Sequence, residues 1–274
     1  MKKLRTIQWS WALIFLFLFV TFTFYTLFTD NSVLINQKNN SSPQHLKSLR
    51  PKTSTCNTGN KYEAIRRLET NPGYRKARQI IRLPYKKDLY IPDGFNSAWN
   101  YCGCRNNLGV DCEFGVGFEP YCDKWILYAA TPEFGWHYVE NGTITFYPGE
   151  IITLILEVLD NKIRCTVYDG DNQLRWDEIL PARGLRSDCS NGEKVRIMST
   201  LVLNQGKNAY SRNNRRFSAI VSTPFTEHQF DGKKGIVGRE TKDNDKVNKW
   251  IKIDTFNPYY NENISLEIST DNPI

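Results

Sequence analysis

An unbroken apolar run near the N-terminus constrains this chain more than any other feature. Residues 9–28, WSWALIFLFLFVTFTFYTLF, contain no charged side chain and no proline. At a helical rise of about 1.5 Å per residue they extend roughly 30 Å, which matches the hydrocarbon core of a bilayer. A helix that is apolar on every side has no face to turn towards water. We therefore predict that residues 9–28 form a single transmembrane helix.

The charges in front of this run predict its orientation. Residues 1–8 contain Lys2, Lys3 and Arg5, and basic residues favour the cytoplasmic side of a membrane. The large C-terminal part would then be extracellular or lumenal. A cleavable signal peptide also starts with basic residues, but its apolar core is usually about 7–15 residues long and precedes a small-residue cleavage site. The run here is longer and lacks that site, which favours a retained signal-anchor over a cleaved peptide.

The distribution of charge indicates the kind of partner. The chain has a formal net charge of +7, yet residues 101–274 contain 20 Lys and Arg against 24 Asp and Glu, a net charge of −4. The basic residues therefore gather in the first third, which includes the polar segment 29–55. That segment has the composition of a flexible stalk. Because a nucleic-acid-binding body needs its basic residues on the folded part, we do not expect nucleic acid as a partner.

Residues 56–91 have the composition of a basic helical segment. The stretch KYEAIRRLET at 61–70 predicts a short helix, NPG interrupts it, and YRKARQIIRL at 74–83 predicts a second helix before Pro84. We expect this helical prefix to pack against the domain that follows. A basic amphipathic segment lying on a membrane is the alternative.

From residue 92 onward the pattern changes to that of β-strands. Short apolar or alternating segments recur between Gly, Pro, Asn and Asp residues, without an alternation of strands and helices. The expected strands are 114–118, 125–130, 134–138, 143–147, 151–159, 162–168, 194–203, 217–222 and 250–256. Residues 92–274 are therefore predicted to form an antiparallel, jelly-roll-like β-sandwich, with a barrel as the alternative.

The order of these segments resembles a known family. FGVGF at 114–118 precedes KWILYAA at 124–130, YPGEIITLILEVLDNKIRCTVYDG at 147–170 and VRIMSTLVLN at 195–204. This order is similar to that of the concanavalin A-like lectins and glucanases, over residues 101–222. The resemblance implies a lectin-like sandwich. The glucanases carry catalytic carboxylates as E-x-D-x-E on one strand, and we find no such run, so the resemblance does not extend to their chemistry.

Seven cysteines and four glycosylation sequons agree with a compartment outside the cytoplasm. The cysteine spacing fits none of the common zinc patterns, and disulfides form readily outside the cytoplasm. An odd number leaves at least one thiol unpaired or bonded to another chain. The candidates for disulfides are Cys102, Cys104, Cys112 and Cys122 in one group and Cys165 with Cys189 in a second, with the connectivity left open. The sequons are at Asn39, Asn40, Asn141 and Asn263.

Motifs of the common enzyme classes are missing from the sequence. It has no G-x-S-x-G, H-E-x-x-H or P-loop motif. The adjacent Asp177 and Glu178 would point to opposite faces of a strand. Residues 169–172, DGDN, resemble a calcium loop without its later Glu, so we expect a plain turn and neither a metal nor a cofactor. A binding protein is favoured over an enzyme, with a membrane-tethered polysaccharide hydrolase or lyase as the alternative.

Aromatic residues make up 13% of the chain and supply the candidate binding residues. Aromatic rings stack on the apolar faces of sugars, although large β cores need such rings as well. Rings beside turns are the better candidates because binding residues concentrate there, and on this basis we select Trp99, Tyr121, Trp136 and Trp176. The sequence thus predicts a single-pass membrane protein that presents a non-catalytic, lectin-like sandwich to a glycan or a surface protein.

Overall fold

The computed structural model describes residues 62–92, 97–204, 206, 208–230, 235–241, 251–257 and 260–269. The predicted cytoplasmic segment 1–8, transmembrane helix 9–28 and stalk 29–55 lie outside the described residues. None of the helices within the described ranges is long and apolar enough to span a bilayer.

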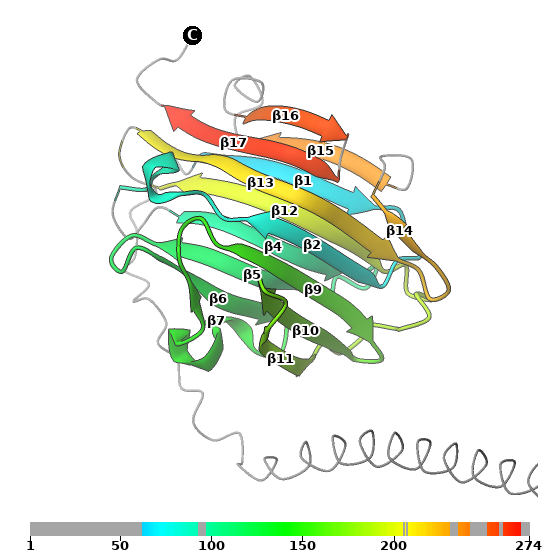
Figure 1. Cartoon of the computed structure of the whole chain (residues 1–274). Helices are drawn as coiled ribbons and strands as arrows, with labels where there is room; N and C mark the ends of the chain where they lie inside the picture. The colour runs from blue at the N-terminus through cyan, green and yellow to red at the C-terminus, as the bar shows by residue number, and fades with distance from the viewer. Residues whose placement is uncertain are drawn as a thin grey trace, which may run out of the picture. The chain divides into compact units, whose positions relative to one another are not determined.

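Two antiparallel β-sheets form this part of the chain (Figure 1). Sheet A has the order β15-β1-β12-β4-β5-β6-β7, with β8 paired to β6. Its strands are β1 (Tyr62–Thr70), β4 (Ser97–Arg105), β5 (Asp111–Glu119), β6 (Lys124–Thr131), β7 (Gly135–Tyr138), β8 (Thr145–Phe146), β12 (Lys194–Leu203) and β15 (Gly235–Thr241). Sheet B has the order β11-β10-β9-β2-β13-β17-β16, with β3 and β14 paired to β13. Its strands are β2 (Lys76–Arg82), β3 (Leu89–Tyr90), β9 (Ile151–Leu159), β10 (Lys162–Asp169), β11 (Leu174–Pro181), β13 (Asn208–Ser222), β14 (Glu227–Gln229), β16 (Ile251–Asn257) and β17 (Asn261–Ser269).

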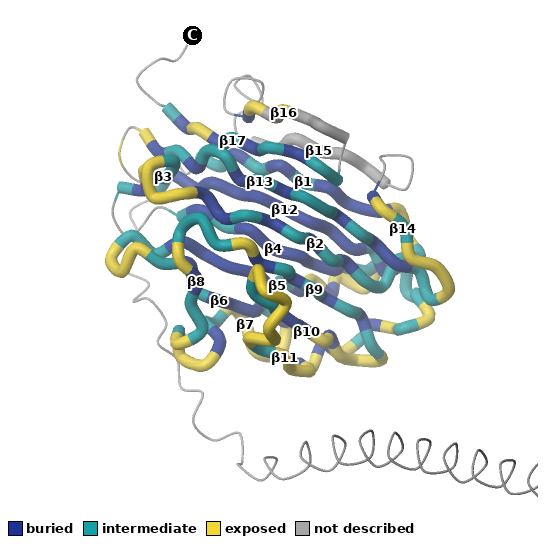
Figure 2. Tube along the Cα trace, viewed as in Figure 1, coloured by how far each residue is buried: buried dark blue, intermediate teal, exposed yellow. Residues whose placement is uncertain are grey.

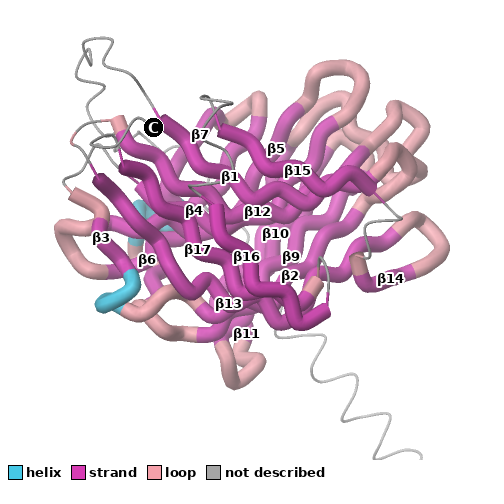
Figure 3. Tube along the Cα trace, turned by 90° about the horizontal axis from the view of Figure 1, so that it is seen from above, coloured by secondary structure: helices cyan, strands magenta, loops and turns pink. Residues whose placement is uncertain are grey.

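Helical structure in the described residues is limited to two short 3-10 turns, η1 (Lys86–Asp88) and η2 (Val139–Gly142). Figure 3 accordingly shows strands joined by loops. The prediction of an antiparallel β-sandwich is confirmed at this level, as two packed sheets with almost no helix.

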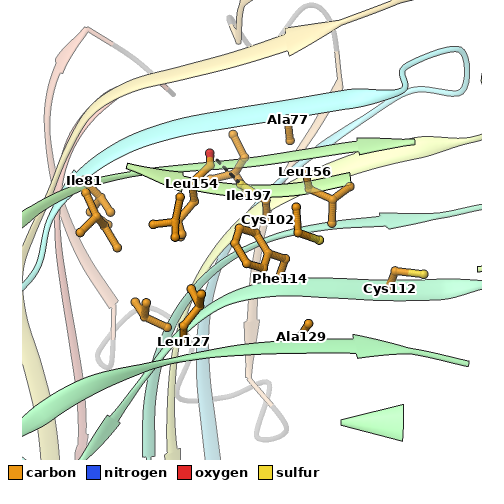
Figure 4. Packing of buried hydrophobic residues seen from close by; sticks show 14 of the residues in the cluster. Ala77, Ile81, Cys102, Cys112, Phe114, Leu127, Ala129, Leu154, Leu156 and Ile197 are labelled. Carbon is orange, nitrogen blue, oxygen red and sulfur yellow. Dashed lines mark hydrogen bonds between the residues drawn. The ribbon is translucent and has the colours of Figure 1, made fainter. Parts of the chain in front are cut away.

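The core lies between the two sheets. Buried and less buried residues alternate along the central strands, as Figure 2 shows. Figure 4 shows Leu154 and Leu156 of β9 close to Cys102 and Phe114 of sheet A, and the Cys102 thiol donates to the Leu154 carbonyl oxygen at 3.7 Å. Each fully buried Leu or Phe side chain contributes about 1.5–3 kcal/mol, so this layer is the main source of stability.

The segment predicted as a helical prefix forms two interior strands instead. β1 lies between β12 and β15, and β2 lies between β9 and β13. Every second side chain is buried between the sheets, including Ala64 and Leu68 of β1 and Ala77 and Ile81 of β2. Helix propensity is a weak preference that tertiary packing overrides. The folded body therefore begins well before residue 92.

Several strands were predicted with correct or nearly correct bounds. β9 and β12 have the predicted bounds, and β5, β6 and β10 differ by three residues or fewer at either end. β4, β11 and β17 were not predicted, and β13 begins at Asn208 rather than at residue 217. β4 has the sequence SAWNYCGCR, in which small and polar residues hide the alternation of inward and outward side chains that is typical of a strand.

The predicted disulfides are absent among the cysteines that the structure describes. Cys102, Cys104, Cys112, Cys122, Cys165 and Cys189 all carry free thiols, and Cys56 lies outside the described residues. Cys104 and Cys112 occupy directly opposite positions on β4 and β5, yet both are packed as buried apolar side chains. Cys122 lies exposed in the β5–β6 turn. Free cysteine behaves as a small apolar residue in cores, which explains the four cysteines buried between the sheets.

A charged cluster also lies between the sheets. Glu262 of β17 accepts hydrogen bonds from Arg66 of β1, with Nε at 3.2 Å, and from Arg216 of β13, with Nη1 at 3.0 Å. Arg216 and Glu262 have no exposed side-chain surface, and Arg66 is almost fully buried. Burial lowers the pKa of Arg216 to about 10, although the Glu262 carboxylate opposes this shift. One carboxylate thus joins both sheets through two guanidinium groups.

Candidate functional site

An aromatic cluster covers part of the outer face of sheet A, opposite to the core. In β4, Cys102 and Cys104 face inward, so the alternation places Trp99 and Tyr101 on the outer face. Tyr128 of β6 and Trp136 and Tyr138 of β7 join them there. We call these five rings, Trp99, Tyr101, Tyr128, Trp136 and Tyr138, the aromatic face.

The rings of the aromatic face contact one another in edge-to-face and tilted geometries. The Trp99 centroid lies 5.0 Å from that of Tyr128 and 5.6 Å from that of Trp136. The Trp136 centroid lies 4.7 Å from that of Tyr138 and 5.6 Å from that of Tyr128. Such pairs are worth about 0.5–1.5 kcal/mol each beyond the area they bury, so the rings hold one another in place.

Glycines in β5 make room for these rings. A Cβ atom on Gly117 would overlap the Trp99 ring, and one on Gly115 would overlap the backbone and Cβ of Tyr101. The motif FGVGF therefore alternates large side chains that enter the core with glycines that leave the outer face bare. The Trp99 ring therefore occupies the space beside Gly117 that a side chain would fill.

The aromatic face combines a buried base with an exposed rim. Tyr128 is 1% exposed and Tyr101 7%, although both lie outside the main core, whereas Trp136 is 37% exposed. Trp99 is partly buried, and its indole N–H donates to Ser97 Oγ at 2.5 Å. An aromatic surface outside the core, with one large ring open to solvent at the β7 edge, is suited to receive a ligand.

Carboxylates border the aromatic face. Glu119, at the end of β5, accepts a hydrogen bond from the Tyr138 hydroxyl. Burial raises the pKa of Glu119, while the Tyr138 hydrogen bond opposes this shift. Burial, followed by the hydrogen bond to Glu119, raises the pKa of Tyr138. The hydroxyl therefore stays protonated and donates at neutral pH.

A pair of carboxylates lies at the other end of β5. Asp111 and Glu113 are alternate residues and share the outer face, where Arg196 Nη2 lies 2.5 Å from Asp111 Oδ1 and 2.9 Å from Glu113 Oε1. Burial raises the pKa of Glu113, and the Arg196 charge partly offsets it. Arg196 lies across Gly103, where a Cβ atom would come within 2.6 Å of its Nε. We call Asp111 and Glu113 the carboxylate pair.

The structure brings together two of the four predicted binding residues. Trp99 and Trp136 belong to the aromatic face, whereas Tyr121 is 79% exposed in the turn after β5 and is not one of its rings. Trp176 of β11 stacks on Phe114 at 5.6 Å between centroids and packs against the core. Trp176 lies between the charged residues Arg175 and Asp177 in the sequence, which gave no sign that its ring packs against the core.

Several residues of the site were missed from sequence. Asp111 and Glu113 form the alternating pattern D-C-E, but the predicted strand began at residue 114 and excluded them. Tyr128 and Tyr138 became site residues only through the pairing of β6 with β7. The glycines of FGVGF were a usable signal, because two glycines at alternate positions of a strand indicate a bare face.

The other candidate residues contribute no ring to the aromatic face. Asn141 is exposed in η2, and Asn263 of β17 donates through its side-chain amide to Asn213 Oδ1 at 3.0 Å, while Asn39 and Asn40 are outside the described residues. Asp169 Oδ1 accepts backbone hydrogen bonds from Asp171 and Gln173, as in an ordinary turn. No group of three or more His, Cys, Asp or Glu in the described ranges is placed to hold a metal ion.

Comparisons with known proteins give only distant structural likenesses. No protein-family model and no curated protein sequence matches the chain. It is similar to a functionally unknown protein from Saccharomyces cerevisiae, with 11% identity, a TM-score of 0.31 and coverage of 50% of this chain and 69% of that one. It is also similar to chicken galectin 2, with 13% identity, a TM-score of 0.27 and coverage of 59% and 98%. A toad ovary galectin in complex with N-acetylgalactose matches with 13% identity, a TM-score of 0.28 and coverage of 51% and 96%. These values assign neither a family nor an activity, so the functional inference rests on the side chains of sheet A.

Proposed function

We propose that this protein is a non-catalytic, lectin-like glycan-binding protein whose ligand contacts the aromatic face. The observation that carries this proposal is the cluster of five rings on the outer face of sheet A, with Trp136 open to solvent and carboxylates at its border. The indole face offers an apolar surface to a sugar ring. Glu119 and the Tyr138 hydroxyl oxygen, whose proton is donated to Glu119, offer acceptors to its hydroxyl groups.

A glycan array with the full-length chain, kept in solution by a neutral detergent, tests the proposal. Trp136→Ala should abolish the binding of whichever glycan the native chain retains, and quenching of tryptophan fluorescence by that glycan should disappear with it. Phe225→Ala is the matched control, because Phe225 is a 93% exposed ring in the β13–β14 turn of sheet B. Retention of no glycan, with or without calcium, would refute the lectin-like function, and an equal loss in both variants would refute the site.

Hydrolysis of a polysaccharide is a second candidate, supported by the carboxylate pair. Because one nitrogen of Arg196 contacts both groups, the two carboxylates lie within about 5.5 Å of each other, as in retaining glycosidases. Glu113, whose pKa is raised by burial, would serve as the acid and Asp111 as the nucleophile. Release of reducing ends, abolished by Glu113→Gln and by Asp111→Asn, would establish this activity. A lyase would instead yield unsaturated products that absorb in the ultraviolet.

We also propose that residues 9–28 anchor the protein in the membrane as a single-pass signal-anchor and that the sandwich lies outside the cytoplasm. We propose further that the sandwich is a jelly roll of the concanavalin A-like type. The support is the uncharged run and the basic residues before it. The chain should resist extraction by alkaline carbonate, and protease added outside intact cells should digest the sandwich. Extraction into the soluble fraction, or protection of the sandwich, would refute this placement.

A further inference from the structure

The outer face of sheet B carries a row of basic side chains along β2. Ala77, Gln79 and Ile81 are buried, so Lys76, Arg78 and Arg82 lie on the opposite face, where they are partly exposed. Figure 2 shows β2 in the interior of this sheet, between β9 and β13. We call Lys76, Arg78 and Arg82 the basic row. Alternate residues of a strand are about 6.6 Å apart, so the row extends for roughly 20 Å.

The charge of the basic row is not neutralised by the described residues. None of its three side chains forms an ion pair there, and Glu157, opposite Lys76 on β9, pairs with Arg75 at 3.3 Å. Arg82 lies directly opposite Arg215 of β13. Burial, followed by the Arg82 charge, lowers the pKa of Arg215. Like charges at opposite positions destabilise a sheet, so a bound anion would reduce the repulsion between Arg82 and Arg215.

Most cations on the other strands of this face have an acidic partner among the described residues. Arg164 of β10 pairs with Asp177 at 2.7 Å, Arg212 of β13 with Glu267 at 2.6 Å, and Lys252 of β16 with Asp254 at 3.8 Å. Lys162 of β10 is an exception, whereas β2 carries three such cations in a row without an ion pair among the described residues. A narrow line of positive charge matches a linear polyanion better than the two-dimensional array of headgroups on a membrane.

Each of two rings beside the basic row has a guanidinium group over one face. The Arg82 guanidinium lies 5.2 Å from the Tyr85 centroid, and that of Arg215 lies 5.0 Å from the Phe217 centroid. Single-stranded nucleic acids bind by stacking their bases on free aromatic rings in a basic groove. With these ring faces engaged by guanidinium groups, the surface suits a polyanion without bases.

We infer that the basic row binds a linear sulfated polysaccharide. The guanidinium groups of Arg78 and Arg82 present several N–H donors to the oxygens of a sulfate group, which a lysine ammonium does less well. The Nε–H groups of Arg78 and Arg82 are buried and have no hydrogen-bond acceptor in the described part of the chain, so contact with a sulfate group would fall to their Nη groups. This site lies on the other sheet from the aromatic face and does not depend on the glycan-binding function proposed there.

Binding of heparin to the full-length chain tests the inference. Arg78→Gln/Arg82→Gln should lower heparin affinity at least tenfold and make its dependence on salt concentration shallower, because two cationic contacts are lost. Lys162→Gln/Lys252→Gln removes the same charge from other strands of sheet B and should change affinity less than threefold. Arg78→Lys/Arg82→Lys keeps the charge and should retain intermediate affinity, which separates loss of contacts from loss of the fold.

Three further probes decide whether sulfate on a polysaccharide is what the row recognises. Chemically desulfated heparin should not bind, and phosphatidylserine vesicles and an oligothymidine should bind more weakly than heparin, without sensitivity to Arg78→Gln/Arg82→Gln. Equal loss in the control double variant, retained binding of desulfated heparin, or tighter binding of vesicles or oligothymidine would each overturn the inference.

Discussion

Glu262→Gln should be among the most destabilising conservative substitutions in the sandwich. The native carboxylate has no exposed surface and accepts hydrogen bonds from Arg66 of sheet A and Arg216 of sheet B. Glutamine keeps the size of the side chain but leaves two guanidinium groups buried without a counter-charge. Removing one partner of a buried ion pair costs about 3–5 kcal/mol, and with two pairs affected we expect about 4–5 kcal/mol. That is a large part of the roughly 5–15 kcal/mol that stabilises a typical domain.

Urea unfolding followed by tryptophan fluorescence measures this loss. At a slope of about 2 kcal/mol per molar urea, the midpoint should fall by roughly 2 M. Glu267→Gln is the control, since Glu267 is half-exposed and pairs with Arg212 on the surface, where an ion pair is worth about 0–1 kcal/mol. A loss below about 1 kcal/mol for Glu262→Gln, or an equal loss in the control, would refute the role assigned to the buried cluster.

Three further predictions concern sheet A and the thiols. Gly117→Ala should displace the Trp99 ring, shift the tryptophan emission and cost about 1–3 kcal/mol; an unchanged spectrum and urea midpoint would contradict the bare-face explanation. Burial raises the pKa of Glu119, so ionisation of this side chain lowers the stability of the folded state as pH rises through that pKa. Glu119→Gln should therefore raise Tm relative to the native chain, and the increase should be larger at pH 7 than at about pH 4. A larger increase at about pH 4 would be evidence against this. Burial raises the pKa of Cys102 to about 12, so this thiol should not react with iodoacetamide at about pH 8 in the native chain. Peptide mass spectrometry should find exposed Cys122 labelled in the native chain and Cys102 labelled only after denaturation. Rapid labelling of Cys102 in the native chain would show that the core opens.

The sequence predicted best the long apolar strands that are bounded by turn residues. β9, IITLILEVL, is almost continuously apolar between two turns, and its bounds were predicted correctly. β1 and β2 were predicted as helices because Arg, Lys, Gln, Ala and Leu have high helix propensity. Their identity as strands depends on partners far away in the chain, β12 at residues 194–203 and β9 at 151–159. Local patterns contain no information about such pairing.

The candidate site could be predicted only in part, because it also depends on which strands pair. Trp99 and Trp136 were selected from their places beside turns, and the pairing of β4, β5, β6 and β7 brought them within 5.6 Å of each other. Trp176 had the same local features, but β11 lies at the edge of sheet B and turns this ring onto Phe114. Which face of a strand is covered depends on the opposite sheet, so the sequence near a single tryptophan could not separate these cases.

The electrostatics of the carboxylate pair place binding ahead of hydrolysis. A retaining glycosidase needs one carboxyl group to be protonated and the other ionised at the start of the reaction. Arg196 donates to both Asp111 and Glu113, and its charge favours the ionised form of Glu113. Burial works in the opposite direction at Glu113 and raises its pKa, but Glu113 would have to give up its contact with Arg196 to act as an acid. The carboxylate pair, held by Arg196 near Tyr101, is instead a ready set of acceptors for sugar hydroxyls, a role that needs no proton transfer.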